Sequence, residues 1–181
     1  MVEKKLGGAG LRGQSAGETS LCTVGKEGSG LTYRGYTIED LAQNAVFEET
    51  AYMLLYGALP SVSELEAYKQ RLISFRELPD SLKAALRLIP KEAHPMDVMR
   101  TGCSVLGNLE PELSFDDQQD AADRLLATLP GMITYWYRFS HDGIEITTDT
   151  GQDTTAGHFL KMLSGKDPSN THRSVMDCSL I

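Results

Sequence analysis

The longest helical pattern in the sequence runs from Phe115 to about Phe139, and it constrains the fold more than any other feature. Its apolar residues recur at steps of three and four, the spacing that places side chains on one face of an α-helix. They are Ala121, Leu125, Leu129, Met132, Ile133 and Trp136. Ser114 is predicted to cap this helix, and Pro130 to kink it because proline removes a backbone hydrogen bond. We therefore expect a mainly α-helical chain.

Shorter helices with recognisable start and stop signals are predicted on both sides. Ser61 and Glu64 form a capping box, while Gly57 and Gly165 are typical of helix C-termini. The predicted helices cover Ile38–Gln43, Val46–Tyr56, Val62–Glu77, Asp80 or Ser81 to Ile89, Pro95 toward Gly107, Asp153–Ser164, and a last one from Asp167 to the final residue. With the long helix, the pattern predicts about eight, and a loop over Ser140–Gln152.

The first 36 residues have a different character. Eight glycines occur in the first thirty residues, with two β-like runs at Leu21–Val24 and Leu31–Tyr33. Glycine-rich connections favour turns and disfavour helix, so we expect a small arm with a short β hairpin over residues 1–36. Residues 37–181 form the helical part.

Composition limits the partners and the compartment. The net charge of −8 and a pI near 5.0 argue against nucleic acid or an anionic membrane as the main partner. The sequence shows neither a signal peptide nor an apolar run long enough for a membrane helix. Three widely separated cysteines, without a Cys-x-x-Cys pair, indicate reduced thiols and a cytoplasmic location.

The residues alone do not define an active site. His94, His141, His158 and His172 form no metal-binding spacing, so no metal site is expected. His94 precedes Pro95, where capping is favoured over catalysis, and His158 is expected to be packed and hydrogen-bonded. Arg34 lies between two tyrosines and is expected to pair with a local carboxylate rather than bind an anion. No Ser/His/Asp or Cys/His group can be assembled.

Segments spread over nearly the whole chain resemble citrate synthases, most closely the bacterial 2-methylcitrate synthases. The resemblance is carried by Gly10–Gly13, Ala16–Thr19 with Cys22–Gly25, Leu31–Tyr36, Phe47–Glu49 leading to Tyr56–Pro60, His94–Gly102, Gly107–Glu112, Tyr135–Tyr137 with Ser140–His141, and Gly157–Leu160. The His-Pro-Met-Asp-Val-Met-Arg-Thr-Gly and Tyr-Trp-Tyr segments favour the methylcitrate branch.

This resemblance implies a homodimer with a large helical domain and a smaller domain that closes over substrate. The implied reaction converts propionyl-CoA, oxaloacetate and water into 2-methylcitrate and CoA, with citrate synthase activity as a further possibility. In such enzymes an Asp removes a proton, one His stabilises the enol and another polarises the ketone. No tightly bound cofactor is implied; acyl-CoA is a substrate.

The resemblance also implies that this chain lacks the catalytic groups, since the family's two catalytic His and its Asp fall beyond Ile181. We therefore expect no synthase activity from the 181 residues alone. Arg12, in Gly-Leu-Arg-Gly, is the one position carried over as a contact to CoA phosphates. The helices over residues 95–107 and 115–139 resemble those of the family's dimer interface; the alternative is ordinary intrachain packing, and both can hold at once because a long helix can bury two faces.

The last predicted helix reaches Ile181 without a stop signal, which favours an interrupted large domain over a frayed terminal helix. Two alternatives to the enzyme fragment remain open. One is a non-catalytic helical module that assembles through its long helices, and the other is a proteolytic fragment.

Overall fold

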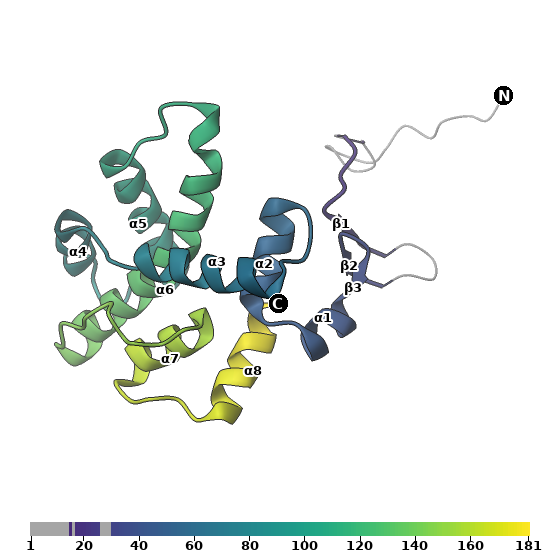
Figure 1. The fold of residues 1–181 in the computed structure, drawn as a ribbon. Helices are drawn as coiled ribbons and strands as arrows, with labels where there is room; N and C mark the ends of the chain where they lie inside the picture. The colour runs from purple at the N-terminus through teal and green to yellow at the C-terminus, as the bar shows by residue number, and fades with distance from the viewer. Residues whose placement is uncertain (1–14, 16, 26–29) are drawn as a thin grey trace.

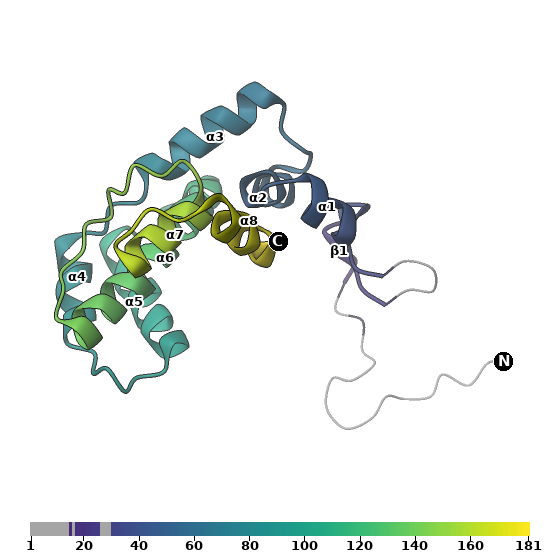
Figure 2. The same ribbon diagram turned by 90° about the horizontal axis from the view of Figure 1, so that it is seen from below.

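A computed structural model describes residues 15, 17–25 and 30–181. Their elements are β1 (Cys22–Thr23), β2 (Thr32–Tyr33), β3 (Tyr36–Thr37), α1 (Ile38–Asn44), α2 (Phe47–Tyr56), α3 (Val62–Ser74), α4 (Asp80–Arg87), α5 (Pro95–Leu109), the 3-10 turn η1 (Phe115–Asp117), α6 (Gln118–Asp142), α7 (Thr155–Ser164) and α8 (Asn170–Leu180). Two views at right angles show the helices gathered around α6, while the small sheet lies to one side next to α1 (Figures 1 and 2). The predicted mainly helical fold is confirmed.

The long helix α6 supplies the centre of the core. Met132, Tyr135 and Trp136 are buried and pack with residues from α4, α5 and the α3–α4 connection. These partners are Leu78, Leu82, Leu86, Val98 and Leu106. Burying each large apolar side chain contributes roughly 1.5–3 kcal/mol, so this cluster accounts for much of the folding energy.

The limits of α6 differ slightly from the prediction. Residues 115–117 form a 3-10 turn, because the Ser114 hydroxyl accepts a hydrogen bond from the Asp116 N–H and tightens the first turn. At the other end the helix continues to Asp142 and closes at Gly143, whose φ of +69° is in the left-handed region.

Helix α3 stops at Ser74, three residues before the predicted end. The side chain of Arg124 explains this, because its Nη1 donates to the carbonyl oxygens of Phe75 and Glu77. Those carbonyls would otherwise be free at the helix end. A contact from α6 therefore replaces the helical hydrogen bonds that the local sequence favours.

The arm contains a third strand that was not predicted. The order β1-β2-β3 is antiparallel throughout, and Tyr33 pairs with Tyr36 across a two-residue turn. Both turn residues, Arg34 and Gly35, have positive φ, as the favoured hairpin turns require. The second hairpin thus follows directly from the turn at Arg34-Gly35.

Asp123 joins three helices through a buried carboxylate. It lies on α6 with no exposed surface and accepts hydrogen bonds from Tyr56 of α2 (2.5 Å), Tyr68 of α3 (3.0 Å) and the Arg71 Nε (2.8 Å). Burial, together with this carboxylate, raises the pKa of Tyr56 to about 12 and that of Tyr68 further. Both phenols are therefore neutral donors at physiological pH.

We expect Asp123→Ala to lower the free energy of unfolding by about 3 kcal/mol, because it leaves two hydroxyls and a guanidinium without their buried partner. Asp123→Asn keeps a hydrogen-bond acceptor, so we expect a smaller decrease in the free energy of unfolding. Urea denaturation followed by Trp136 fluorescence measures both. Equal stability of the alanine variant and the wild type would contradict this assignment.

His158 is fully buried on α7, as the sequence predicted for a packed histidine. Its Nδ1 lies 2.8 Å from the Thr150 hydroxyl, whereas its Nε2 has no hydrogen-bond partner. Burial and the nearby Arg76 lower the pKa of His158 from 6.5 to about 3. The imidazole is therefore neutral in the folded chain.

Since the unfolded chain binds this proton more tightly, stability should fall as the pH drops below 6.5. The expected slope is about 1.4 kcal/mol per pH unit down to the folded-state pKa. His158→Asn can keep the hydrogen bond to Thr150, and its free energy of unfolding should lack this pH-dependent decrease. Denaturant titrations between pH 7 and pH 4 measure the difference between the two proteins. If the free energy of unfolding changed with pH in the same way in both proteins, the assignment of a buried neutral imidazole would be refuted.

Candidate functional site

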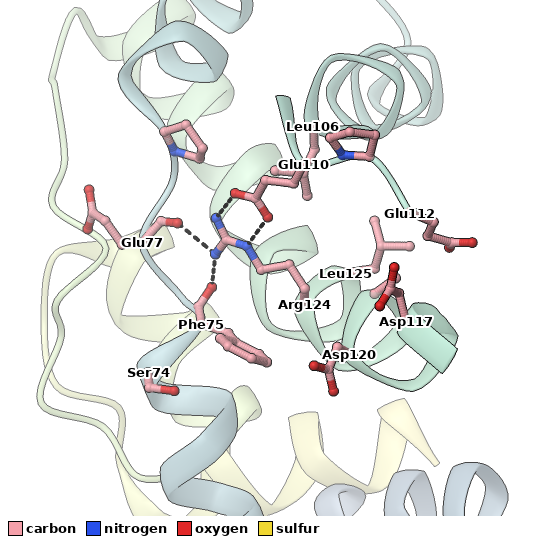
Figure 3. A pocket seen from close by; sticks show the side chains of 13 residues that line it. Ser74, Phe75, Glu77, Leu106, Glu110, Glu112, Asp117, Asp120, Arg124 and Leu125 are labelled. Atoms are coloured by element: carbon pink, nitrogen blue, oxygen red, sulfur yellow. Dashed lines mark hydrogen bonds and ion pairs between the residues drawn. The ribbon is translucent and has the colours of Figure 1, made fainter. Parts of the chain in front are cut away.

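A hollow lies where the end of α3, the end of α5 and the start of α6 meet. It encloses about 580 Å³, and Figure 3 shows its lining side chains. They are Ser74, Phe75, Glu77, Pro79, Leu106, Glu110, Pro111, Glu112, Asp117, Asp120, Ala121, Arg124 and Leu125. This volume suffices for a small metabolite, so the charge of the lining decides what the hollow can accept.

Arg124 is the only cation in this lining, and most of its N–H donors are used within the chain. Its Nε and Nη2 donate to the two carboxylate oxygens of Glu110, each at 2.8 Å, and Nη1 donates to the carbonyls of Phe75 and Glu77. Figure 3 shows this fork. The Arg124 hydrogen bond lowers the pKa of Glu110, so the pair stays ionised. Of the five N–H donors of Arg124, one on Nη2 is left over from these contacts, so the side chain has little capacity for a ligand.

The rest of the lining is acidic. Five carboxylates and one guanidinium line the hollow, which gives a formal charge of −4. Asp120 is itself bound to Arg71, and Asp117 accepts from the backbone N–H groups of Leu113 and Ser114. A site for dicarboxylates or phosphates needs free cations or backbone donors. This hollow therefore repels the anionic substrates that the resemblance implied.

A second hollow of about 480 Å³ lies between α3 and the loop over residues 148–153. Arg76 lines it but is almost entirely buried, and its Nη1 donates to the Gln152 carbonyl at 2.5 Å. Glu77, Asp149 and Asp153 also line it, so its balance is again acidic. Arg76 holds the loop in place and leaves little cationic surface for a ligand.

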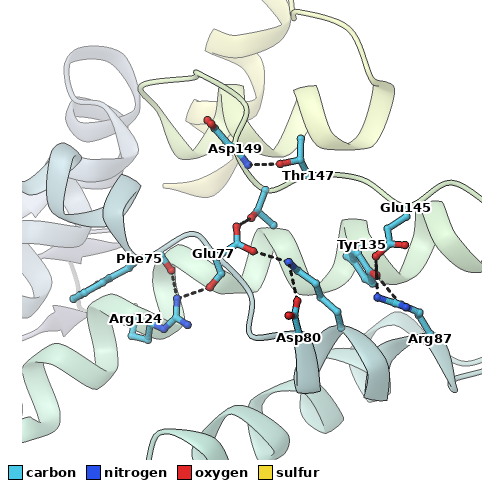
Figure 4. Close-up of polar contacts among 11 residues, drawn as sticks. Phe75, Glu77, Asp80, Arg87, Arg124, Tyr135, Glu145, Thr147 and Asp149 are labelled. Carbon is cyan, nitrogen blue, oxygen red and sulfur yellow. Dashed lines mark hydrogen bonds and ion pairs between the residues drawn. The ribbon is translucent and has the colours of Figure 1, made fainter.

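The connection between α6 and α7, which includes this loop, lies beside further polar contacts that Figure 4 shows. Glu77 accepts from the Thr148 hydroxyl and from Lys83, each at 2.5 Å. Arg87 donates to the Tyr135 hydroxyl and to Glu145, both at 2.8 Å. Hydrogen bonds from Lys83 and Thr148 lower the pKa of Glu77. These groups stabilise the fold around the hollows.

The structure places the singled-out residues in supporting roles. His94 caps α5, its Nδ1 accepting from the Met96 N–H at 3.2 Å, as expected. Among the described residues Arg34 has no carboxylate partner, and its Nη2 donates to the Leu54 carbonyl at 3.0 Å instead. Arg12, with the Gly10–Gly13 segment, lies outside the described residues.

The histidines of the described residues make few polar contacts. Among these residues, no histidine ring bonds to a carboxylate; His141, for example, bonds to the Ser140 hydroxyl and the Tyr137 carbonyl. Residues 15, 17–25 and 30–181 also hold no group of three or more His, Cys, Asp or Glu fit for a metal ion. Among these same residues, no helix is both long and apolar enough to cross a membrane.

Sequence reasoning missed the buried and partly buried charges that organise these regions. Arg124, Arg76 and Glu48 each lie within a helical pattern or at its end, where a charged residue is normally expected on the exposed face. No local signal distinguishes them, because their partners lie tens of residues away along the chain.

Known proteins are similar to this chain in sequence and in fold. Over 98% of its length the chain is 64% identical to a 2-methylcitrate synthase from Shewanella oneidensis, covering 48% of that protein, and over 89% it is 37% identical to 2-methylcitrate synthase 2 from Corynebacterium glutamicum, covering 43%. The chain spans about half the length of the curated relatives it matches.

Solved structures agree with this likeness. A citrate synthase from Thermotoga maritima superposes with a TM-score of 0.81 at 32% identity, covering 94% of this chain and 44% of that one. The Thermoplasma acidophilum enzyme, solved with carboxymethyl coenzyme A and oxaloacetate, gives 0.85 at 24% identity over 93% of this chain and 45% of that one, which shows the fold alone. Residues 10–181 match the family model for the citrate synthase C-terminal domain. The chain therefore belongs to the citrate synthase family.

Proposed function

We propose that these residues form one half of a 2-methylcitrate synthase, which joins propionyl-CoA to oxaloacetate and hydrolyses the thioester with water, releasing 2-methylcitrate and CoA. In this reaction the acyl group becomes an alkyl group as the new C–C bond forms. The 64% identity to the Shewanella oneidensis enzyme over nearly the whole chain carries this proposal. The three free cysteines, Cys22, Cys103 and Cys178, support a cytoplasmic location.

The 181 residues alone are proposed to be inactive. Condensation requires a base for the α-proton and donors for two developing oxyanions. The described part of the chain offers acidic hollows and histidines that serve as a cap or as packing. Substrate binding and proton transfer are therefore assigned to the missing half, with Arg12 as the one proposed CoA contact from this half.

The test joins residues 1–181 to the remaining half of the Shewanella oneidensis enzyme. We expect this chimera to release CoA from propionyl-CoA and oxaloacetate, and the 181-residue chain to release none above background. Free thiol, measured with a chromogenic disulfide, reports the reaction, and acetyl-CoA tests the citrate branch. Activity of the purified chain alone would refute its inactivity. A folded but inactive chimera would favour a non-catalytic assembly module.

We also propose a homodimer that forms through α5 and α6. Both helices carry apolar side chains that remain exposed in the single chain, with Met96 and Leu109 on α5 and Leu125 and Tyr137 on α6. Exposed apolar residues gathered on neighbouring helices are typical of an interface between subunits. The same helices bury their other faces in the core, so the two uses are compatible.

Met96→Glu together with Tyr137→Glu should weaken the dimer at least tenfold, because charges would enter an apolar interface. Glutamate is compatible with the first turn of α5, so folding should persist. Leu88→Glu changes a residue that is more exposed than Met96 or Tyr137 but lies at the end of α4, and it serves as the control. Sedimentation equilibrium measures the association. A wild-type monomer at high concentration would contradict the proposal.

A further inference from the structure

Two buried carboxylates join the first turn of α2 to the last two helices. Asp177, on α8, accepts from the Phe47 N–H through both oxygens at 3.3 Å. Glu48, on α2, accepts from the Thr155 N–H at the start of α7 at 2.6 Å. The partners are 130 and 107 residues apart in sequence. Helices α2, α7 and α8 lie together in Figure 2.

Both contacts satisfy free backbone donors at helix starts. The first N–H groups of a helix have no partner within it, and a carboxylate there also interacts favourably with the helix dipole. Such caps usually come from the residue just before the helix. Val46, the residue before α2, has no side-chain acceptor of its own, and Asp177 fills this role from a distant helix.

Keeping these charges buried is costly. Glu48 is 1% exposed, and its Oε2 has no hydrogen-bond partner. Asp177 is 9% exposed; its pKa is raised by burial and by the nearby Glu48 and Glu49, against the opposing effects of the Phe47 N–H and Lys69. An apolar residue of similar size would avoid this cost but could not accept a hydrogen bond. The carboxylate therefore adds a hydrogen bond, which constrains the relative orientation of the two helices that it joins.

We propose that Asp177 and Glu48 are positioning residues. Asp177 fixes the orientation of α8 against α2, and Glu48 fixes the orientation of α7 against α2. Together they set the direction in which the C-terminal end of α8 points. The proposal rests on the proposed function, in which the catalytic groups come from the missing half. It assigns to α2 a role in aligning the two halves. Neither side chain contacts substrate in this role.

The structural test compares Asp177→Asn, which keeps a carbonyl acceptor, with Asp177→Leu, which has none. Amide hydrogen exchange by NMR on the 181-residue chain should show Phe47 and the α8 amides exchanging at least tenfold faster in the leucine variant. The asparagine variant should stay within threefold of wild type. Equal exchange in all three proteins overturns the proposal. If the leucine variant does not fold, fast exchange at Phe47 in the asparagine variant overturns it, and wild-type exchange supports it.

The functional test places the same substitutions in the chimera. Asp177→Leu should reduce kcat/KM for oxaloacetate at least tenfold relative to the parent chimera. Asp177→Asn should keep kcat/KM within threefold of the parent chimera. Ser179→Ala changes an exposed residue two positions further along α8; it is the control and should leave kcat/KM unchanged. Full activity of the leucine variant overturns the proposal. An inactive parent chimera counts against the proposed function instead, and the exchange experiment then decides the positioning role.

Discussion

Burial of one face of α6 is the interaction on which the rest of the structure depends. Met132, Tyr135 and Trp136 give α4 and α5 a common apolar surface, and this packing brings the ends of α3 and α5 close to the start of α6. Only then can Arg124 reach both Glu110 and the end of α3. The polar contacts that shape the hollows are thus consequences of the apolar core, because they join residues that the core has already brought together.

The arginines of the described residues are used mainly to hold the fold together. Arg71, Arg76, Arg87 and Arg124 all bond to carboxylates, a phenol or backbone carbonyls of the same chain. Each guanidinium offers several donors in a planar fork, which suits it to joining separate segments. Cations used in this way are not free for phosphate or carboxylate ligands. The hollows beside Arg76 and Arg124 are left with excess negative charge, in keeping with a chain of net charge −8.

Local sequence predicted the helices well where one signal dominated. The Ser61–Glu64 capping box starts α3 at Val62, and Gly57 closes α2. Of the predicted apolar stripe on α6, Met132 and Trp136 are buried, whereas Leu125 is exposed. Predictions were less accurate where a distant residue intervened, as at the end of α3. The third strand was missed because a two-residue strand carries almost no periodicity, and its turn is signalled only by Arg34-Gly35.

By itself, the sequence determined the helical class, most helix limits and, through ordered segments along the chain, the family. These features depend on neighbouring residues or on resemblance, and both can be read along the chain. Tertiary structure alone decided which charges are buried and what they bind: Asp123 with two tyrosines, Asp177 with the start of α2, Glu48 with the start of α7. The reason is physical, because a buried carboxylate needs donors, and here folding brings those donors from residues more than fifty positions away.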